Sequence, residues 1–168
     1  MLAGTVDLRL PGLTKLLGSL KGACKVETHV GIFEEASYPD GTSVAYVGYL
    51  NEYGGHNPPR PFLRRTQQKK FNKWLGIYTN VLKGGITAAN IDKAHNQIGI
   101  VASQDVKITA KQWNPSDPRM NSPATIRAKA RKSAGAKGKN QVGNDPTRVL
   151  HDTGIMINSI TYKVEQKK

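Results

Sequence analysis

Residues 114–148 limit the possible fold more than any other part of this chain. Four prolines and eight Lys/Arg fall in this run, which has almost no large apolar side chains. Such a composition cannot bury enough apolar surface to build a core by itself. We therefore expect a single domain over residues 1–168. It would carry a basic arm at about 115–148 that is mobile in the free protein and becomes ordered on assembly. A Ser-Pro start predicts one short helix in the arm, from 122 to about 132.

Hydrophobic periodicity divides the rest of the chain into strands and helices. Alternating apolar and polar residues predict short strands at 6–10, 26–32 and 160–164. Apolar residues at helical spacing predict helices at 13–22, 44–53, 62–83 and 90–113. A turn or short helix is expected around Ile155 and Ile157. The fold expected is α+β, a small mixed or antiparallel sheet packed by two or three helices, with an extended basic arm.

The 44–53 segment has a helix start and a helix stop at its ends. Ser43 can cap the first turn, and Gly54 is expected to end the helix in a left-handed conformation. Val44 and Tyr53 fall on one predicted apolar face. A strand is the competing interpretation, because Val and Tyr are common in strands.

Positive charge is concentrated after residue 60. The whole chain carries a formal charge of +13. Residues 1–60 hold five Lys/Arg and six Asp/Glu, a net −1, whereas residues 61–168 hold twenty and six, a net +14. This asymmetry suggests an acidic partner for the C-terminal part, either nucleic acid or an acidic protein surface. A solvated face that maintains solubility is the simpler interpretation.

The sequence has no pattern of residues typical of a catalytic or metal site. Cys24 is the only cysteine, so no disulfide can form within the chain. The four histidines have no other His or Cys at metal-ligand spacing; they are His29, His56, His95 and His151. No phosphate-binding loop or nucleophile motif is present. We therefore expect no enzyme activity, no cofactor and no metal. The absence of a signal sequence or long apolar run predicts a reducing, aqueous compartment and no membrane contact.

Residues 62–78 combine basic and aromatic side chains. Phe62, Phe71, Trp74 and Tyr78 share this segment with five Lys/Arg. Such a surface could bind nucleic acid. The helical spacing of the aromatic residues favours the other interpretation, in which they pack in the core while the basic residues face water.

Two blocks of sequence carry a resemblance to a known family. The first runs from Val44-Ala45 to Asn51-Glu52-Tyr53-Gly54, followed by Pro59-Arg60-Pro61-Phe62-Leu63-Arg64. The second contains Leu150, then Asp152-Thr153-Gly154, Met156 and Ser159-Ile160, preceded by Ser122, Thr125-Ile126 and Lys129. With these blocks in this order, the chain resembles the phage virion-morphogenesis family, the minor tail and tail-completion proteins of the head-tail neck.

The resemblance implies a structural role in the virion. Members of the family are small α+β domains that close into a ring around the DNA channel. It implies a homo-oligomeric ring, with a hexamer favoured, that contacts tail-tube, tail-terminator or head-tail connector proteins and lies near packaged DNA. The chain would be assembled in the host cytoplasm and would reside in the neck or tail of the virion.

The same resemblance suggests which residues make contacts between subunits or with neighbouring neck proteins. In the first block they are Glu52, Tyr53, Arg60, Phe62 and Arg64, with Glu52 accepting hydrogen bonds from an arginine of a neighbour and Tyr53 and Phe62 serving as anchors. In the arm they are Lys129, Arg131, Lys132, Lys137 and Lys139, which would contact a protein surface or DNA. The alternative function is a basic nucleic-acid-binding protein without enzymatic activity.

Overall fold

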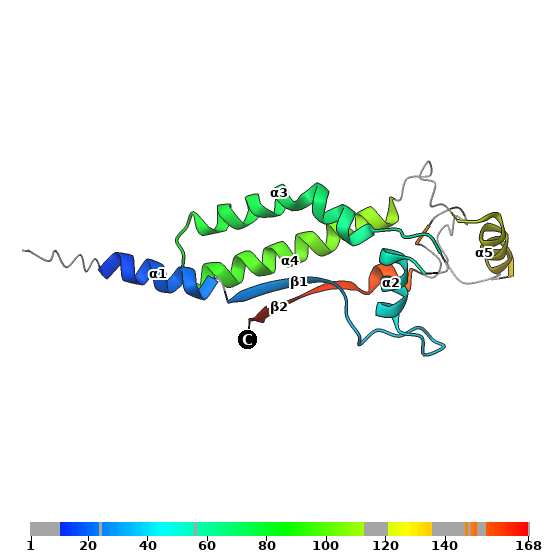
Figure 1. Ribbon diagram of the computed structural model, residues 1–168, viewed down its shortest axis with the longest axis horizontal. Coiled ribbons are helices and arrows are strands. Elements are labelled where there is room, and N and C mark those ends of the chain that lie inside the picture. The colour runs from blue at the N-terminus through cyan, green and yellow to red at the C-terminus, as the bar shows by residue number, and fades with distance from the viewer. Residues whose placement is uncertain are drawn as a thin grey trace, which may run out of the picture.

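The computed structural model of the chain is an α+β fold with six helices and a two-stranded antiparallel sheet (Figure 1). It describes residues 11–23, 25–55, 57–112, 121–135, 147, 149–150 and 154–167. The elements in chain order are α1 (Pro11–Ala23), β1 (Val26–Ile32), α2 (Val44–Tyr53), α3 (Phe62–Leu82), α4 (Ala88–Lys111), α5 (Pro123–Gly135), α6 (Ile155–Asn158) and β2 (Ile160–Gln166).

Helix α4 is the central element of the molecule. It lies between α3 on one side and the two strands on the other (Figure 1). Gly84 and Gly85 break the chain between α3 and α4, and Gly85 has a φ of 113° that few residues other than glycine adopt. Thr87 then caps α4 by accepting a hydrogen bond from the Asn90 N–H at 3.2 Å. The two long helices therefore form an antiparallel hairpin.

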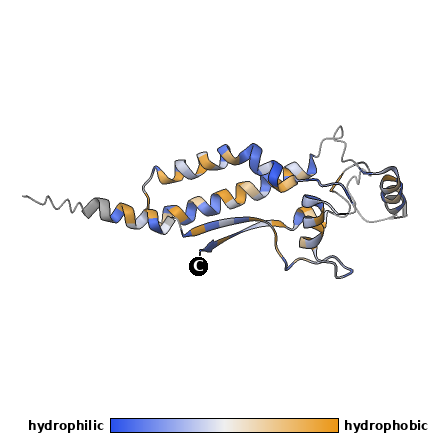
Figure 2. Ribbon diagram, viewed as in Figure 1, coloured by the Kyte–Doolittle hydropathy of each residue, from blue (hydrophilic) through white to orange (hydrophobic). Residues whose placement is uncertain are grey.

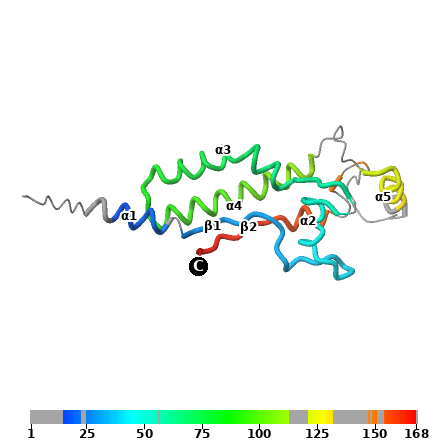
Figure 3. Tube along the Cα trace, in the orientation of Figure 1, coloured from blue at the N-terminus to red at the C-terminus, as the bar shows by residue number. Residues whose placement is uncertain are grey.

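The sheet pairs an early segment of the sequence with a late one. β1 and β2 pair antiparallel, with Val30 opposite Tyr162 and Ile32 opposite Ile160, so the blue and red strands run side by side (Figure 3). Because side chains alternate along a strand, these residues share one face, and that face packs on α4. The Tyr162 ring lies directly over Gly99, where any Cβ would overlap it. The close approach of the sheet to α4 therefore requires glycine at position 99.

The main hydrophobic core lies where α2, α6 and the ends of α3 and α4 meet. Its fully or nearly fully buried members come from segments far apart in the sequence: Val44, Phe62, Val106, Ala110, Val149, Met156, Ile157 and Ile160. After Phe62 and Leu63 the first turns of α3 are hydrophilic (Figure 2), so the fully buried Phe62 and the partly buried Leu63 hold this end of the helix on the core. α1 lies outside this core, at the opposite end of the molecule (Figure 1).

Most of the predicted elements are confirmed. The strand at 26–32, the helix at 44–53 rather than a strand, the short helix after residue 122 and the last strand are all present. Ser43 accepts a hydrogen bond from the Tyr46 N–H, as expected of an N-cap. The strand predicted at 6–10 lies outside the described residues, as does the part of the basic arm between 136 and 146.

The predicted buried faces of two helices are partly wrong. Apolar residues at helical spacing predict that Ile108 lies on the core side of α4, but it is 48% exposed, whereas Asp105 is buried on the same helix. On α2 the buried positions are Val44, Gly48 and Glu52, so Tyr53 is on the exposed side of the helix. In the described part of the chain, none of the helices is long and apolar enough to span a membrane.

Candidate interface site

The end of α2 is shaped by Gly54. Its N–H donates to the Leu50 carbonyl at 2.9 Å and so closes the last turn of the helix. The φ of Gly54 is positive as predicted, at 92°, but its ψ of 170° is extended and not the left-handed helical value that was expected. This conformation is nearly exclusive to glycine. It turns the chain sharply away from the helix axis and into the proline-rich loop that leads to α3.

Glu52 caps α3 from the neighbouring helix. Its carboxylate is only 1% exposed and accepts hydrogen bonds from the Leu63 N–H at 2.8 Å and the Arg64 N–H at 3.1 Å. Pro61 precedes α3 and supplies no side-chain cap. Because the first N–H groups of a helix have no partner within it, and its N-terminus is partially positive, a buried carboxylate is well suited to this place.

Arg64 completes the contact with Glu52 from within the same chain. Its Nε donates to the Glu52 carboxylate at 2.9 Å, and its terminal nitrogen donates to the Glu52 carbonyl at 2.8 Å. The expectation that Glu52 accepts hydrogen bonds from a neighbouring subunit is therefore corrected. Its acceptors are occupied by α3 of its own chain, and its carboxylate is shielded from the surface.

Arg60 and Phe62 also lie inside the folded chain and not on its surface. The Arg60 N–H donates to the Asn51 carbonyl at 2.6 Å, and the residue is 7% exposed. Phe62 is completely buried in the main core. Their predicted role as surface contacts is corrected, because neither side chain can reach a partner while the chain keeps this fold. The aromatic ring at 62 anchors α3 to the core.

The two sequence blocks that carry the family resemblance meet in this region. Asn51, from the first block, donates from its side-chain amide to the sulfur of Met156, from the second, at 3.7 Å. Val44 and Phe62 share the core with Met156 and Ile157. Asn51 and Met156 are 105 residues apart in the sequence. The described residues of the two blocks at this point thus share one packed core.

The exposed side of α2 carries three tyrosines, which we call the tyrosine face: Tyr46, Tyr49 and Tyr53. Each is more than half exposed. The rings of Tyr49 and Tyr53 lie 4.9 Å apart, and the Arg64 guanidinium lies 4.8 Å from the Tyr53 ring centre. Of the residues predicted to form an interface, Tyr53 and Arg64 are therefore at the surface. Tyr46 and Tyr49 were missed, although their spacing from Tyr53 places all three on one side of a helix.

The aromatic residues of α3 are divided between core and surface. Phe62 is buried, Trp74 is half-buried, and Phe71 is 53% exposed. The Trp74 Nε1 and the Lys73 ammonium both donate to the Asp105 carboxylate, each at 2.9 Å. Burial alone would raise the pKa of Asp105, but these two hydrogen bonds and the nearby lysine charges outweigh it and lower the pKa. The expectation that all the aromatic residues pack inside while the basic residues face water is thus correct only in part.

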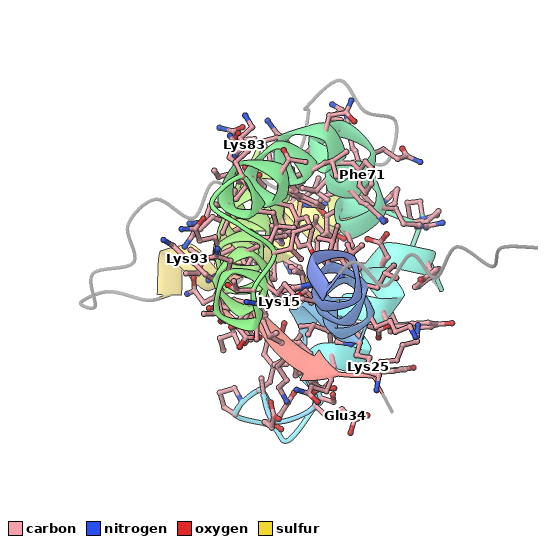
Figure 4. The ribbon with its side chains drawn as sticks, turned by 90° about the vertical axis from the view of Figure 1, so that its left-hand side faces the viewer. Lys15, Lys25, Glu34, Phe71, Lys83 and Lys93 are labelled. Atoms are coloured by element: carbon pink, nitrogen blue, oxygen red, sulfur yellow. The ribbon has the colours of Figure 1, made fainter. Side chains whose placement is uncertain are left out.

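An open groove of about 490 Å³ runs beside this part of α3. Ile98, Ala102 and Val106 of α4 lie along it, and Thr28, His29 and Val30 of β1 form one wall. The opposite wall belongs to α3 and the end of α2, with Phe71, Trp74 and Tyr53. Viewed along the molecule from the α1 end, Phe71 lies on the opposite side of the helical layer from Lys83 and Lys93 (Figure 4). β2 contributes none of the described residues that line the groove.

The basic arm contains helix α5. Lys129 and Arg131 lie on it, and Lys129 lines a cavity of about 170 Å³ together with Arg60 and Asn51 of the first motif block. The arm therefore reaches the region where the two blocks meet. The structure describes no side chain at Lys132, and Lys137 and Lys139 lie outside the described residues.

His95 is the most enclosed of the described histidines. Its Nδ1 lies 2.8 Å from the Thr28 hydroxyl, and its Nε2 is buried with no hydrogen-bond partner. Burial lowers the pKa of His95, opposed by the Asp92 carboxylate. Among the described residues, no three His, Cys, Asp or Glu side chains are grouped so that they could hold a metal ion.

No protein-family model, curated protein or solved structure matches this chain.

Proposed function

We propose that the chain is a structural protein of a tailed-phage virion, a tail-completion or neck component that forms a ring at the head-tail junction around the DNA channel. The observation that carries the proposal is the meeting of the two motif blocks. Asn51 of the first block donates to Met156 of the second, and Phe62 of the first shares the main core with Met156. Residues shared with a family are expected to be coupled in this way when they specify a common fold.

The surface suits a subunit that binds copies of itself. A closed ring requires two different patches on each subunit, one of which meets the other patch on the next subunit. The tyrosine face offers large, amphipathic rings with Arg64 beside Tyr53, a composition typical of the central residues of interfaces. The exposed leucines of α1, at the other end of the molecule, offer a second and different patch (Figure 1). The groove beside Phe71 borders the tyrosine face, since Tyr53 belongs to both. We propose a homo-oligomer, a hexamer by the resemblance, without enzymatic activity.

The basic arm would contact neighbouring neck proteins or the packaged DNA. Lys129 and Arg131 lie on α5, at the same end of the molecule as α2 and opposite α1 (Figure 1). Tail-tube, tail-terminator and connector proteins are the protein partners that the resemblance implies. Glutamine at Lys129, Arg131, Lys132, Lys137 and Lys139 together is expected to impair ring or neck assembly if the arm binds protein. It would leave assembly intact and change only DNA retention if the arm binds phosphates.

The first test is assembly of the purified protein. Electron micrographs are expected to show rings, and light scattering to give a mass that is a small multiple of one chain. Tyr49→Ala combined with Tyr53→Ala is expected to abolish or weaken the rings while the monomer stays folded. Ile100→Ala combined with Ile108→Ala is the matched control, since these two side chains are about equally exposed on α4. A monomer in all conditions, and normal particles from a phage that carries both tyrosine changes, would contradict the proposal.

Nucleic-acid binding is the second candidate, and the exposed side of α3 favours it. Arg64, Lys69, Lys70 and Lys73 are exposed there, close to the exposed ring of Phe71. In that case the purified protein retains DNA with an affinity that falls steeply with salt. Glutamine at Lys69 and Lys70 would then reduce the slope of log K against log salt by about 1–2. Ring formation without such retention would favour the virion role.

A further inference from the structure

We infer that the groove beside Phe71 and the free edge of β1 receive the N-terminal segment of a second copy of this chain, residues 5–10, as a third strand of the sheet. The inference deepens the proposed function, since it names the contact through which one subunit of the ring holds the next. It depends on the shape of the groove, the unpaired edge, the pattern of residues 5–10 and the reach of the chain.

β1 is an edge strand, and no described strand pairs with its second edge. It pairs with β2 on one side, and the groove borders its other side. The seven residues of β1 contain no proline and no bulge that would prevent another strand from pairing. A two-stranded sheet is also only marginally stable, and a third strand strengthens it. The edge is therefore a ready template for an extended peptide.

The groove next to this edge has an apolar floor and an aromatic rim. Ile98, Ala102 and Val106 form the floor, and Phe71 stands at the rim with more than half of its surface exposed. A strand added beside β1 would direct every second side chain onto this floor. Its other side chains would continue the opposite, polar face of the sheet, where Glu27 pairs with Lys167 at 3.0 Å.

Residues 5–10 have the pattern that such a site requires. Val6, Leu8 and Leu10 alternate with Thr5, Asp7 and Arg9, so one face of the extended segment is apolar and the other polar. Six extended residues span about 20 Å, close to the length of the seven-residue β1. The side chains of Thr5, Asp7 and Arg9 would then lie on the charged outer face of the sheet.

The segment cannot reach the groove of its own chain. α1 has 13 residues and is therefore about 20 Å long, and it projects from the end of the molecule at which β1 begins (Figure 1). Val6 lies five residues before Pro11, so it can be at most about 18 Å from the tip of α1. Leu10 directly precedes Pro11 and Leu8 lies three residues before it, so both are held near the tip of α1 and cannot lie along β1 of their own chain. The occupant must therefore come from another copy.

The exposed leucines of α1 agree with this arrangement. Leu16, Leu17 and Leu20 lie on one side of the helix, and each is more than 40% exposed. A helix that carries the inserted strand to the next subunit would bring these leucines against that subunit as well. The contact joins the N-terminal end of one copy to the side of another, which is the head-to-tail type of interface from which rings are built.

Paired substitutions in the full chain test the contact by sedimentation velocity. Leu8→Asp places a carboxylate on the apolar face of the segment, whereas Thr5→Asp adds the same charge on its polar face. Phe71→Asp alters the groove rim, whereas Leu75→Asp alters a side chain of similar exposure, 49%, that does not line the groove. Leu8→Asp and Phe71→Asp are expected to raise the dissociation constant of self-association at least about tenfold. Thr5→Asp and Leu75→Asp are expected to leave it within about threefold.

Disulfide trapping identifies the partners directly. In a Cys24→Ser background, protein carrying Leu8→Cys is mixed with protein carrying Val30→Cys and oxidised. A mixed disulfide between the two proteins is expected, and Lys163→Cys on β2 is the control that should not give one with Leu8→Cys. The inference is overturned if Leu8→Asp associates like the unmodified chain. It is equally overturned if the Lys163→Cys control cross-links as well as Val30→Cys does.

The outcomes for the contact and for the neck role are distinguishable. Rings that persist in the Leu8→Asp protein would overturn the strand contact and leave the proposed function standing. A specific disulfide between Leu8→Cys and Val30→Cys, in a protein that forms no ring and enters no virion, would establish the contact and remove the neck role. An unmodified chain that remains monomeric at about 100 µM overturns the contact, since the inferred strand contact would then have no detectable affinity in this range.

Discussion

Replacing Glu52 is expected to cost more stability than replacing any other charged residue at the α2–α3 junction. Glu52→Ala leaves the Leu63 and Arg64 N–H groups without their acceptor in a place that water reaches poorly. A hydrogen bond to a charged group contributes about 1.5–3 kcal/mol, and loss of a helix cap alone costs about 1 kcal/mol. Water can supply part of the lost hydrogen bonding at this end of α3, so we expect the free energy of unfolding to fall by about 2–4 kcal/mol.

Two matched variants separate the cap from the ion pair. Glu52→Gln keeps one acceptor oxygen but loses the charge, and it should cost about half as much as Glu52→Ala. Arg64→Ala leaves the cap intact and removes a guanidinium whose side chain is 51% exposed. It should cost about 1 kcal/mol or less, because solvent screens such a pair. Urea unfolding followed by circular dichroism measures all three. If Arg64→Ala costs as much as Glu52→Ala, the ion pair and not the cap holds the junction, and the reasoning is refuted.

Four further substitutions test other parts of the structure by the same measurement. Gly54→Ala should lower the free energy of unfolding by about 1–2 kcal/mol because of the positive φ of this residue. Gly76 has open space around it in the middle of α3, so Gly76→Ala should raise the free energy of unfolding by about 0.5–1 kcal/mol. Equal effects of the two changes would contradict this. Gly99→Ala should cost about 1–3 kcal/mol, since the Tyr162 ring must move, and a neutral result would show that the ring yields freely. Asp105→Asn should destabilise the protein at pH 7, and the gap from the unmodified chain should narrow as the pH falls below the ordinary carboxyl value of 3.8. The lowered pKa of Asp105 in the fold means that its stabilising charge is present above that value and is lost as the pH falls through the folded pKa. A gap that does not change with pH would refute this.

Local signals in the sequence were sufficient to place most helices and strands. Ser43 and Gly54 mark the two ends of α2. Ser43 caps the helix as predicted, whereas Gly54 ends it with the predicted positive φ but with an extended ψ. The alternation at 26–32 and 160–164 identified both described strands. That these two strands pair with each other, with Val30 opposite Tyr162, was not predictable from periodicity, because register depends on contacts between residues far apart in the sequence.

The candidate site shows where sequence patterns were insufficient. A glutamate on a helix is usually exposed, so nothing local indicates that Glu52 is buried. Its burial depends on the N-terminus of α3 arriving beside it, which is a property of the folded chain. The burial of Glu52 also explains why the tyrosines of α2 are exposed. Once Val44, Gly48 and Glu52 face inward, helical geometry requires Tyr49 and Tyr53 to face solvent.

The pairing of β1 with β2 sets the order in which this protein can be completed during synthesis. β1 ends at Ile32 and β2 begins at Ile160, so the strand pair and the surface of α4 beneath it stay unfinished until β2 has been made. Closing so long a loop is entropically costly and slow compared with forming the α3–α4 hairpin. Throughout that interval, the newly made chain exposes β1 with both edges unpaired and α4 with Gly99 uncovered. The yield of soluble protein in a cell therefore depends on how fast the chain is finished and on what shields β1 until then.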